Sequence, residues 1–384
     1  MSVSRRQVLY VIGSSVVIAA AGATAFSMTR TPGAALRPWS AAGTGYADPR
    51  MRALSYAILA PNPHNRQPWL VDLSQESKIT LFCDADRRLP ETDPFDRQIS
   101  IGLGCFLELL SMAAASDGYA SDVTLFPNGT SEERLDERPV AEITLRRDPL
   151  AKAPELFRYV HDRRTNRSLY DTSRPIAPDV LGQLQTASFS GLTIGTTNTE
   201  DGVKQLRALT WTGHEIEMLT ESTRMESVRL MRIGKSEIQT NPDGIYLGGA
   251  MLEALNLVGM LTRETIGDPK SDAFKQGMDM FRGLLNSAMG YVWVVTDSNS
   301  RAEQIATGRA WLGINLRATA LRLALQPLSQ TLQEYPEMAF ARVEIHKALG
   351  AGPGQTVQML GRLGYADQVP PSPRWGLETR VASS

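Results

Sequence analysis

The most informative stretch of this sequence is APNPHNRQPW, residues 60–69. Pro61 and Pro63 stop the helical pattern that precedes them and force an extended or turning backbone. The Asn and Gln side chains each offer a donor and an acceptor, which suits a heterocycle whose edge alternates C=O and N–H groups. The same residue types also favour a simple turn. Composition alone therefore leaves two interpretations open, a turn after a helix and a ligand-binding loop, with the turn favoured.

Alternating and helical patterns extend outward from this stretch and predict a first unit of mixed α and β structure. A helix is expected before the loop, followed by two strands, a long apolar helix marked by Gly102 and Gly104, and two more strands before a break at Asp148-Pro149. The expected ranges are 52–59, 69–72, 79–83, 100–116, 122–126 and 141–146. The run Gly102-Leu103-Gly104 lacks a third glycine, so it is not interpreted as a dinucleotide-binding turn.

The second unit is predicted to be mainly helical, with two strands. Its expected helices are 179–186, 201–227, 250–262, 273–288, 302–325 and 336–349, and its strands are 291–296 and 356–363. Residues 100–119 and 308–326 resemble each other weakly, because each is a glycine-marked helix rich in Leu and Ala beside a strand. We therefore divide the chain into residues 1–26, 27–48, 49–150 and 151–384, the last two ranges being two similar halves.

Two further segments carry side chains suited to an anionic ligand. The run from His161 to Arg167 places Arg163, Arg164, Thr165 and Arg167 together, and guanidinium groups bind phosphate through paired N–H donors. A solvated basic surface explains this run equally well. In the tail, prolines 370, 371 and 373 would hold Ser372 and Arg374 at fixed spacing, although a proline-rich chain end is more often unstructured.

The N-terminus has the layout of an export signal. Arg5 and Arg6 precede an uncharged, largely apolar run at 10–26, and Ala23-Thr24-Ala25 offers a small-x-small cleavage site. The alternative is a membrane anchor, since the run is just long enough to span a bilayer. Its glycines and hydroxyl residues favour the signal. We expect export by the twin-arginine route to a periplasmic or other extracytoplasmic location, with residues 27–48 as a tether.

Charge and composition exclude several classes of function. Forty basic and 41 acidic residues give a net charge of −1, which argues against nucleic acid as a partner. The only two cysteines, Cys83 and Cys105, are too far apart for a redox or zinc motif and are expected to be buried and unpaired. The four histidines show no metal-binding spacing. No metal site and no side-chain nucleophile are therefore expected.

Taken together and in order, the three segments resemble the nitroreductase superfamily of FMN flavoproteins. Residues 60–69 are similar to the A-P-S-x-x-N-x-Q-P-W loop of that family, with Asn65 at the flavin-contacting asparagine. Residues 163–167 are similar to its R-R-S-x-R phosphate motif, with Thr165 in place of serine. The elements Gly364-Tyr365 and Ser372-Pro373-Arg374 resemble its C-terminal G-Y and P-R elements, of which the latter reaches the FMN phosphate.

The order of the motifs differs from that of a simple member, in which the arginine motif precedes the asparagine loop. The arrangement resembles a tandem subgroup whose two halves in one chain mimic the usual homodimer. The resemblance implies an α+β, nitroreductase-like fold, with a central antiparallel or mixed sheet flanked by helices and two halves that form a pseudo-dimer. It implies either a monomer of this kind or a homodimer, with one FMN per chain.

The resemblance also implies the activity and the cofactor-binding residues. The expected activity is an FMN-dependent oxidoreductase that passes two electrons to nitroaromatic or quinone-like small molecules, from NAD(P)H or another donor; the alternative is an FMN-binding or storage protein with little turnover. The expected cofactor-binding residues are Asn65, Gln67, Arg163, Arg164, Thr165, Arg167, Gln326, Leu328, Ser372 and Arg374. Arg66 is a further candidate for stabilising reduced flavin. The protein is expected to meet a membrane only during export.

Overall fold

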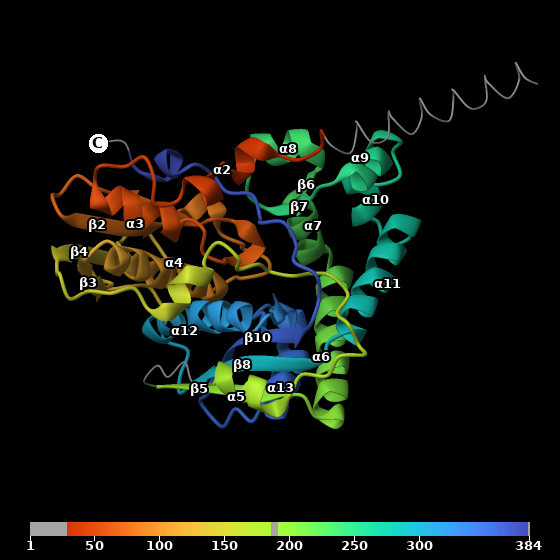
Figure 1. Cartoon of the computed structure of the whole chain (residues 1–384). Helices are drawn as coiled ribbons and strands as arrows, with labels where there is room; N and C mark the ends of the chain where they lie inside the picture. Colours follow the sequence, from red (N-terminus) through yellow and green to blue (C-terminus); the bar gives the residue numbers. More distant parts are fainter. Residues whose placement is uncertain (1–28, 186–190, 383–384) are drawn as a thin grey trace, which may run out of the picture.

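A computed structural model describes residues 29–185 and 191–382 of the chain (Figure 1). The predicted export signal at residues 1–26 lies outside the described residues.

The first half of the chain forms a four-stranded antiparallel sheet with two helices. Helix α3 (Pro49–Ala57) is capped by the side chain of Asp48, which accepts from the backbone N–H of Arg50. The chain continues as β1 (Trp69–Asp72), β2 (Lys78–Cys83), α4 (Arg97–Ser116), β3 (Tyr119–Leu125) and β4 (Ala141–Arg147). The strand order is β1-β2-β4-β3, and every pair is antiparallel.

The second half repeats this topology. Its strands are β5 (Leu192–Thr197), β8 (Gly290–Thr296), β9 (Ala324–Pro327) and β10 (Thr356–Gly364), with α12 (Arg301–Ala320) between β8 and β9. Their order is β5-β8-β10-β9, again antiparallel throughout. In each sheet the strands follow the order first, second, fourth and third, and the long helix connects the second strand to the third. The expected α+β class is confirmed, although the strands form two antiparallel sheets instead of one central sheet.

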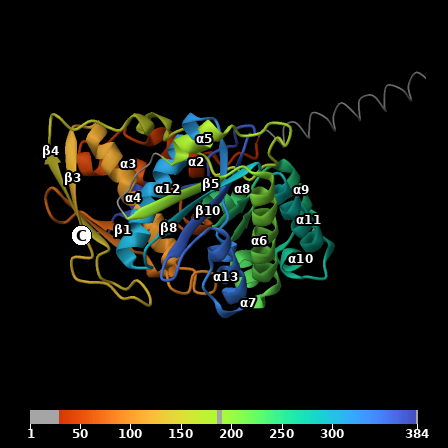
Figure 2. The same cartoon turned by 90° about the horizontal axis from the view of Figure 1, so that it is seen from below.

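The two halves differ mainly by a long insert between β5 and β8, whereas β1 and β2 are joined by a short loop. Within the insert, β6 and β7 form the one parallel pair among the described strands. Its elements are α6 (Glu200–Leu219), α7 (Glu221–Arg229), β6 (Met231–Ile233), α8 (Gly234–Thr240), β7 (Ile245–Leu247), α9 (Ala250–Leu257), α10 (Arg263–Gly267) and α11 (Asp272–Asn286). Figures 1 and 2 both show α9, α10 and α11 at the outer edge of the molecule, beyond α6.

The remaining elements connect and cover these units. They are α2 (Gly33–Ala41), α5 (Pro178–Leu184), α13 (Ala339–Ala348) and the 3-10 turns η1 (Pro63–Asn65), η2 (Ala85–Arg87), η3 (Glu155–Tyr159), η4 (Gln330–Leu332), η5 (Pro336–Met338) and η6 (Leu377–Arg380).

The halves meet where α4 crosses α12, and glycine is required at the crossing. A Cβ atom on Gly104 would lie 2.2 Å from the backbone oxygen of Ile305, and one on Gly308 would lie 2.0 Å from that of Ile101. The two contacts are reciprocal, as expected for a pseudo-two-fold axis through the crossing. Each helix is 20 residues long and begins with a buried arginine, so the sequence similarity noticed between these helices corresponds to a real structural equivalence.

Helix α4 is long and apolar enough to span a bilayer. Most of its side chains, however, are buried against α3, α12 and β3. It is therefore the core helix of the first half.

Several predictions about local structure are wrong. The second half has β5, β6, β7 and β9 besides the two strands expected, because strand pairing depends on distant residues, and the helix expected at 201–227 is divided into α6 and α7. The tether expected at 27–48 contains α2, whose Trp39 is buried, because this aromatic side chain packs onto the protein. The helix expected at 302–325 ends at Ala320, and its last residues enter β9, where the left-handed Arg322 turns the chain. The proline-rich tail is ordered, with Pro373 and Arg374 buried. Both cysteines are buried and free, as expected.

Candidate functional site

The candidate site is a pocket formed by segments that are far apart in the sequence. The Ala60–Trp69 loop meets the 163–167 segment and the C-terminal tail there, and residues 244–246 of the insert and Trp39 of α2 complete the wall. The lining residues are Trp39, Pro61, Asn62, His64, Asn65, Arg163, Arg164, Thr165, Arg167, Gly244, Ile245, Tyr246, Pro370, Ser372 and Arg374.

The loop that enters the pocket has an unusual backbone. His64, Asn65 and Gln67 have φ angles of 45°, 52° and 53°, in the left-handed region that residues other than glycine seldom adopt. The flanking prolines and the fully buried Gln67 side chain hold this conformation. Strained backbone of this kind persists where the surrounding structure imposes it, and it is concentrated at functional sites.

Arg163 contributes a buried guanidinium group that lacks a partner. Its Nη2 donates to the backbone oxygen of Leu59 at 3.2 Å, but its Nη1 has no hydrogen-bond partner among the described residues. Burial lowers the pKa of Arg163, and the neighbouring Arg164 lowers it further. A buried donor of a charged group that has no acceptor costs free energy, so we expect the Arg163 Nη1 to donate to a bound ligand.

Arg374 is also buried, but its donors are fully used. Its guanidinium donates to the backbone oxygens of Ile58, Leu59 and Ala60, which end the α3 turn, at 2.8, 3.1 and 3.1 Å. It also donates to the Asn65 Oδ1 and the Ser372 Oγ, at 2.5 and 2.6 Å. Arg374 therefore positions the loop and the tail and adds a positive charge, and the carbonyl groups it satisfies belong to the turn that follows α3.

Two more arginines and an indole complete the positive wall. Arg164 donates to the backbone oxygens of His161, Arg163 and Val369, and Arg167 is exposed at the pocket rim. The guanidinium carbons of Arg163, Arg164 and Arg374 lie 5.8, 5.0 and 5.5 Å from the Trp39 ring, within the range of cation–π contact. The Trp39 Nε1 donates to the backbone oxygen of Ser372 at 2.8 Å, which joins α2 to the tail.

We call Arg163, Arg164, Arg167 and Arg374 the pocket arginines. Within the ranges 29–185 and 191–382, none of them forms an ion pair with a carboxylate, and no Asp or Glu lines the pocket. Burial lowers the pKa of Arg374 too, and Arg163 and Arg164 add repulsion. Like charges gathered without a counter-ion favour binding of an anion, and guanidinium groups match the oxygens of a phosphate.

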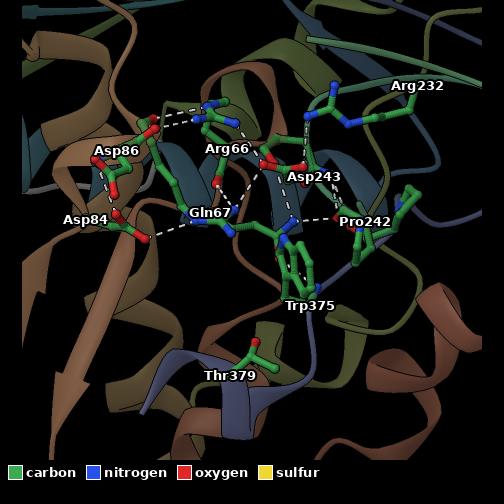
Figure 3. Close-up of polar contacts among 12 residues, drawn as sticks. Arg66, Gln67, Asp84, Asp86, Arg232, Pro242, Asp243, Trp375 and Thr379 are labelled. Atoms are coloured by element: carbon green, nitrogen blue, oxygen red, sulfur yellow. Dashed lines mark hydrogen bonds and ion pairs between the residues drawn. The ribbon is translucent and has the colours of Figure 1, made fainter. Parts of the chain in front are cut away.

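A second arginine cluster lies beside the pocket and has its own counter-ion (Figure 3). The Asp243 carboxylate accepts from Arg66, Arg87 and Arg232 at 2.7, 3.0 and 3.2 Å. Arg87 and Arg380 also contact Asp84, at 3.0 and 3.1 Å. We call Asp243 with its three arginines the Asp243 cluster. Because Asp243 is in the insert and Arg66 is in the Ala60–Trp69 loop, this cluster fixes one to the other.

The insert also occupies the amide groups of the loop. The Gln67 Nε2 donates to the backbone oxygen of Pro242 at 2.7 Å, and its Oε1 accepts from the backbone N–H of Trp375 at 2.9 Å. The Asn65 Nδ2 donates to the backbone oxygens of Pro373 and Pro242, at 3.0 and 3.5 Å. The amides that were expected to face a ligand therefore hold the insert and the tail in place.

The structure brings together seven of the ten residues expected at the site. Asn65, Arg163, Arg164, Thr165, Arg167, Ser372 and Arg374 line one pocket. Gln67 is buried behind the wall. Gln326 and Leu328 are buried outside the lining: the Gln326 side chain accepts from Arg362 at 2.7 Å, and Leu328 belongs to a hydrophobic cluster of the second half.

Several lining residues were not identified from the sequence. Trp39 was hidden in the segment interpreted as a tether, and its only signal was a lone tryptophan among small residues. Gly244, Ile245 and Tyr246 follow the turn sequence Asn241-Pro242-Asp243-Gly244, which marks a turn but not what the turn contacts. Residues 244–246 are far from the Ala60–Trp69 loop in the sequence, and the course of the insert brings them next to it.

Comparison with known proteins finds sequence relatives but no matching family model. A protein of Mycobacterium tuberculosis, whose name assigns it provisionally to the NAD(P)H nitroreductases, is 26% identical over 336 residues, which cover 84% of this chain and 87% of the relative. A Serratia protein with a similar provisional name, PigM, is 28% identical over 126 residues, which cover 32% of this chain and 34% of the relative.

Solved structures show a more distant likeness. A nitroreductase with bound FMN from Desulfitobacterium hafniense aligns with 60% of this chain and 98% of its own, at 13% identity and a TM-score of 0.35. The FMN-dependent nitroreductase NfnB from Mycobacterium smegmatis, in complex with NADPH, aligns with 60% and 98% at 18% identity and a TM-score of 0.36.

Proposed function

We propose that this protein is an FMN-dependent oxidoreductase of the nitroreductase type, with the cofactor phosphate held by the pocket arginines. The observation that carries the proposal is the buried Arg163 Nη1, which has no partner among the described residues, in a pocket lined by arginines and by no carboxylate. The relative from M. tuberculosis, similar over 84% of the chain, supports the choice of reaction.

The residues present fit a phosphate monoester. Arg163 has an unused donor, Arg164 and Arg167 add charge, and the hydroxyl groups of Thr165 and Ser372 line the same pocket. Charge-assisted hydrogen bonds from guanidinium groups to phosphate are stronger than neutral ones, and hydroxyl donors add bonds at low desolvation cost. Arg374 keeps Asn65 and Ser372 in position through its own contacts.

FMN supplies the hydride and electron chemistry when bound, and the protein binds and orients it. The pocket arginines would hold the phosphate, and Asn62, His64 and Asn65 of the strained loop line the same pocket. Arg66, a candidate for stabilising a reduced flavin, is paired with Asp243 and does not line the pocket. We infer that small flat acceptors, nitroaromatics or quinones, receive two electrons, with NAD(P)H or another reductant as donor.

The proposal also includes the tandem arrangement of the chain and its route of export. The repeated strand order and the reciprocal glycine contacts support a tandem pseudo-dimer in one chain. Export by the twin-arginine route rests on the Arg5-Arg6 sequence, and it would suit a protein that acquires its cofactor before it crosses the membrane.

One observation favours the second candidate, an FMN-binding or storage protein. Residues 244–246 of the insert line the pocket, and Pro242 accepts from the amides of Asn65 and Gln67, so the insert covers one side of the pocket and would narrow the access of an acceptor. Rapid mixing of dithionite-reduced holoprotein with menadione distinguishes the two. Reoxidation much faster than with dissolved oxygen alone indicates an oxidoreductase, and reoxidation no faster than that indicates storage.

Binding of FMN and of riboflavin tests the phosphate assignment. We expect FMN to bind more tightly than riboflavin by about 1.5–3 kcal/mol, the range for hydrogen bonds to charged groups. Arg163→Met should remove most of this preference, whereas Arg158→Met, at an exposed arginine of η3, should leave it unchanged. Equal affinity for the two flavins in the unaltered protein would refute the assignment.

A further inference from the structure

Helix α9 is apolar, yet it has no buried residue. Its sequence from Ala250 to Leu257 is AMLEALNL, in which only Glu253 and Asn256 are polar. Met251, Leu257 and Val258 are 72%, 71% and 70% exposed, and Met260 just beyond the helix is 64% exposed. A helix of this composition is normally stabilised by burying its apolar side, so the α9 face lacks the partner that its sequence predicts.

We call Met251, Ala254, Leu257, Val258 and Met260 the α9 face. All five are exposed, and Met251, Ala254 and Val258 lie at helical spacing on one side. The only acidic residue of the helix, Glu253, is turned toward the protein, where it accepts from Arg30 at 2.8 Å and from the backbone N–H of Lys235. The face itself therefore carries no charge.

The described part of the chain begins beside this helix. Besides the ion pair between Arg30 and Glu253, the Lys235 Nζ donates to the backbone oxygen of Thr29 at 2.9 Å. The first described residues are thus held against α8 and α9 (Figure 1). The 28 residues that precede them include the uncharged, largely apolar run at 10–26, which has the length and composition to enter a bilayer. The first described residues therefore lie beside an exposed apolar helix, and the apolar run at 10–26 precedes them in the sequence.

We propose that the α9 face rests on a lipid bilayer, at the point where the N-terminal segment enters it. An uncharged apolar helix side held parallel to a membrane buries its side chains at the boundary between head groups and acyl chains. The cationic Arg30 and Lys235 lie at the junction between the helix and the N-terminal segment, where lipid phosphates would be neighbours. The proposal takes the alternative in which the N-terminal segment is retained as a membrane anchor, and it is independent of what the pocket binds.

Environment-sensitive fluorophores on single introduced cysteines in the full-length chain test this proposal. Cys83 and Cys105 are buried, so labelling in the native state is selective. The introduced positions are Val258→Cys on the α9 face, Val17→Cys in the N-terminal segment as a positive control, and Val343→Cys on α13 as a matched control, since Val343 is 63% exposed. The protein is reconstituted with vesicles of phosphatidylcholine and phosphatidylglycerol, with and without brominated lipid.

We expect the probes at positions 17 and 258 to shift to shorter wavelength and to be quenched by brominated lipid, and the probe at 343 to do neither. Adding Leu257→Asp and Met260→Asp should abolish the response at 258 and spare that at 17. A response at 17 without one at 258 would overturn the proposal, as would the lack of both. A shift at 258 that grows with protein concentration in the absence of vesicles would instead identify a second copy of the chain as the partner.

Discussion

The pocket arginines and the Asp243 cluster lie on either side of the same loop, but only one of them contains its counter-ion. In the Asp243 cluster a buried carboxylate contacts three guanidinium groups, so each of these arginines has a carboxylate partner within the chain, although the cluster keeps a net positive charge. The pocket arginines have only carbonyl, hydroxyl and amide oxygens as acceptors. Buried charges are stable when they are paired, and the difference therefore separates a structural cluster from a site that needs an external anion.

The largest effect should follow the removal of the carboxylate from the Asp243 cluster. Asp243→Asn leaves Arg66 and Arg232 without a carboxylate partner and Arg87 with Asp84 alone, and breaking a buried ion pair in this way costs about 3–5 kcal/mol. Chemical unfolding should show this loss in the free energy of unfolding. Glu155→Gln, at an exposed pair with Arg158, is the control and should change stability by less than about 1 kcal/mol. If Asp243→Asn left the free energy of unfolding nearly unchanged, the Asp243 carboxylate would not be what stabilises its arginines.

The next largest effect is the change in the free energy of unfolding when one arginine is removed, and we expect it to differ between the two clusters. Arg163→Met removes an uncompensated charge, so we expect the unfolding free energy of the protein without ligand to stay within about 1 kcal/mol or to rise. Arg232→Met removes a partner of Asp243 and should lower it by about 1.5–3 kcal/mol. Parallel urea titrations of both variants measure the contrast. Equal destabilisation would show that Arg163 is merely a structural arginine.

Anions should stabilise the protein through the pocket arginines alone. An FMN concentration of about 100 times the dissociation constant should stabilise the folded state by about 2.7 kcal/mol, and inorganic phosphate should give a smaller effect of the same sign. Arg163→Met should reduce this stabilisation, whereas Arg158→Met should retain it. Thermal unfolding with and without each anion is the measurement. Stabilisation that survives Arg163→Met unchanged would locate the anion elsewhere.

The smallest effect concerns His64, which lies between the two clusters. Burial, with smaller contributions from Arg167 and Arg66, lowers the pKa of His64 to about 4. The unfolded chain takes up this proton near pH 6.5 but the folded chain does not, so the stability contribution is complete above pH 6.5 and is lost as the pH falls to about 4. The full shift corresponds to about 3 kcal/mol, and because the His64 side chain is only partly buried we expect a change on the order of 1 kcal/mol. His64→Gln should reduce the dependence of the unfolding free energy on pH in this range. Bound FMN should narrow the range, because the phosphate raises the His64 pKa. A pH profile that the substitution leaves unaltered would exclude His64 as the cause.

The sequence identifies most elements of the fold because they depend on local periodicity. Strand β1 coincides with the predicted range, and α4 and β8 differ from it by three residues or fewer. The end of α12 was missed because Leu321 and Leu325 keep the i, i+4 apolar spacing of the helix, while the pairing of Leu325 with β10 depends on residues far along the chain. Trp39 was missed for the same reason: its partners are the tail and the 163–167 segment.

The site was predictable in its charges but not in its contacts. The arginine motif and the tail motif were expected to meet at one ligand, and the structure places them in one pocket. The amides of Asn65 and Gln67 donate to Pro242, and Arg66 pairs with Asp243. These contacts could not be predicted, because nothing in the sequence indicates that the insert packs against the loop. Gln326 and Leu328 were assigned by loose correspondence alone, and they lie outside the pocket lining.

The crossing of α4 and α12 has a consequence for the behaviour of the protein on dilution. When two separate chains form such an interface, the folded state depends on their concentration, and a site built from both is lost when they dissociate. Here the reciprocal contacts of Gly104 and Gly308 join two halves of one chain, so they have a fixed effective concentration for each other. The pocket can therefore remain assembled in a very dilute compartment. A single cut near Leu150, whose side chain is 85% exposed between the halves, would remove this protection and make the integrity of the pocket depend on protein concentration.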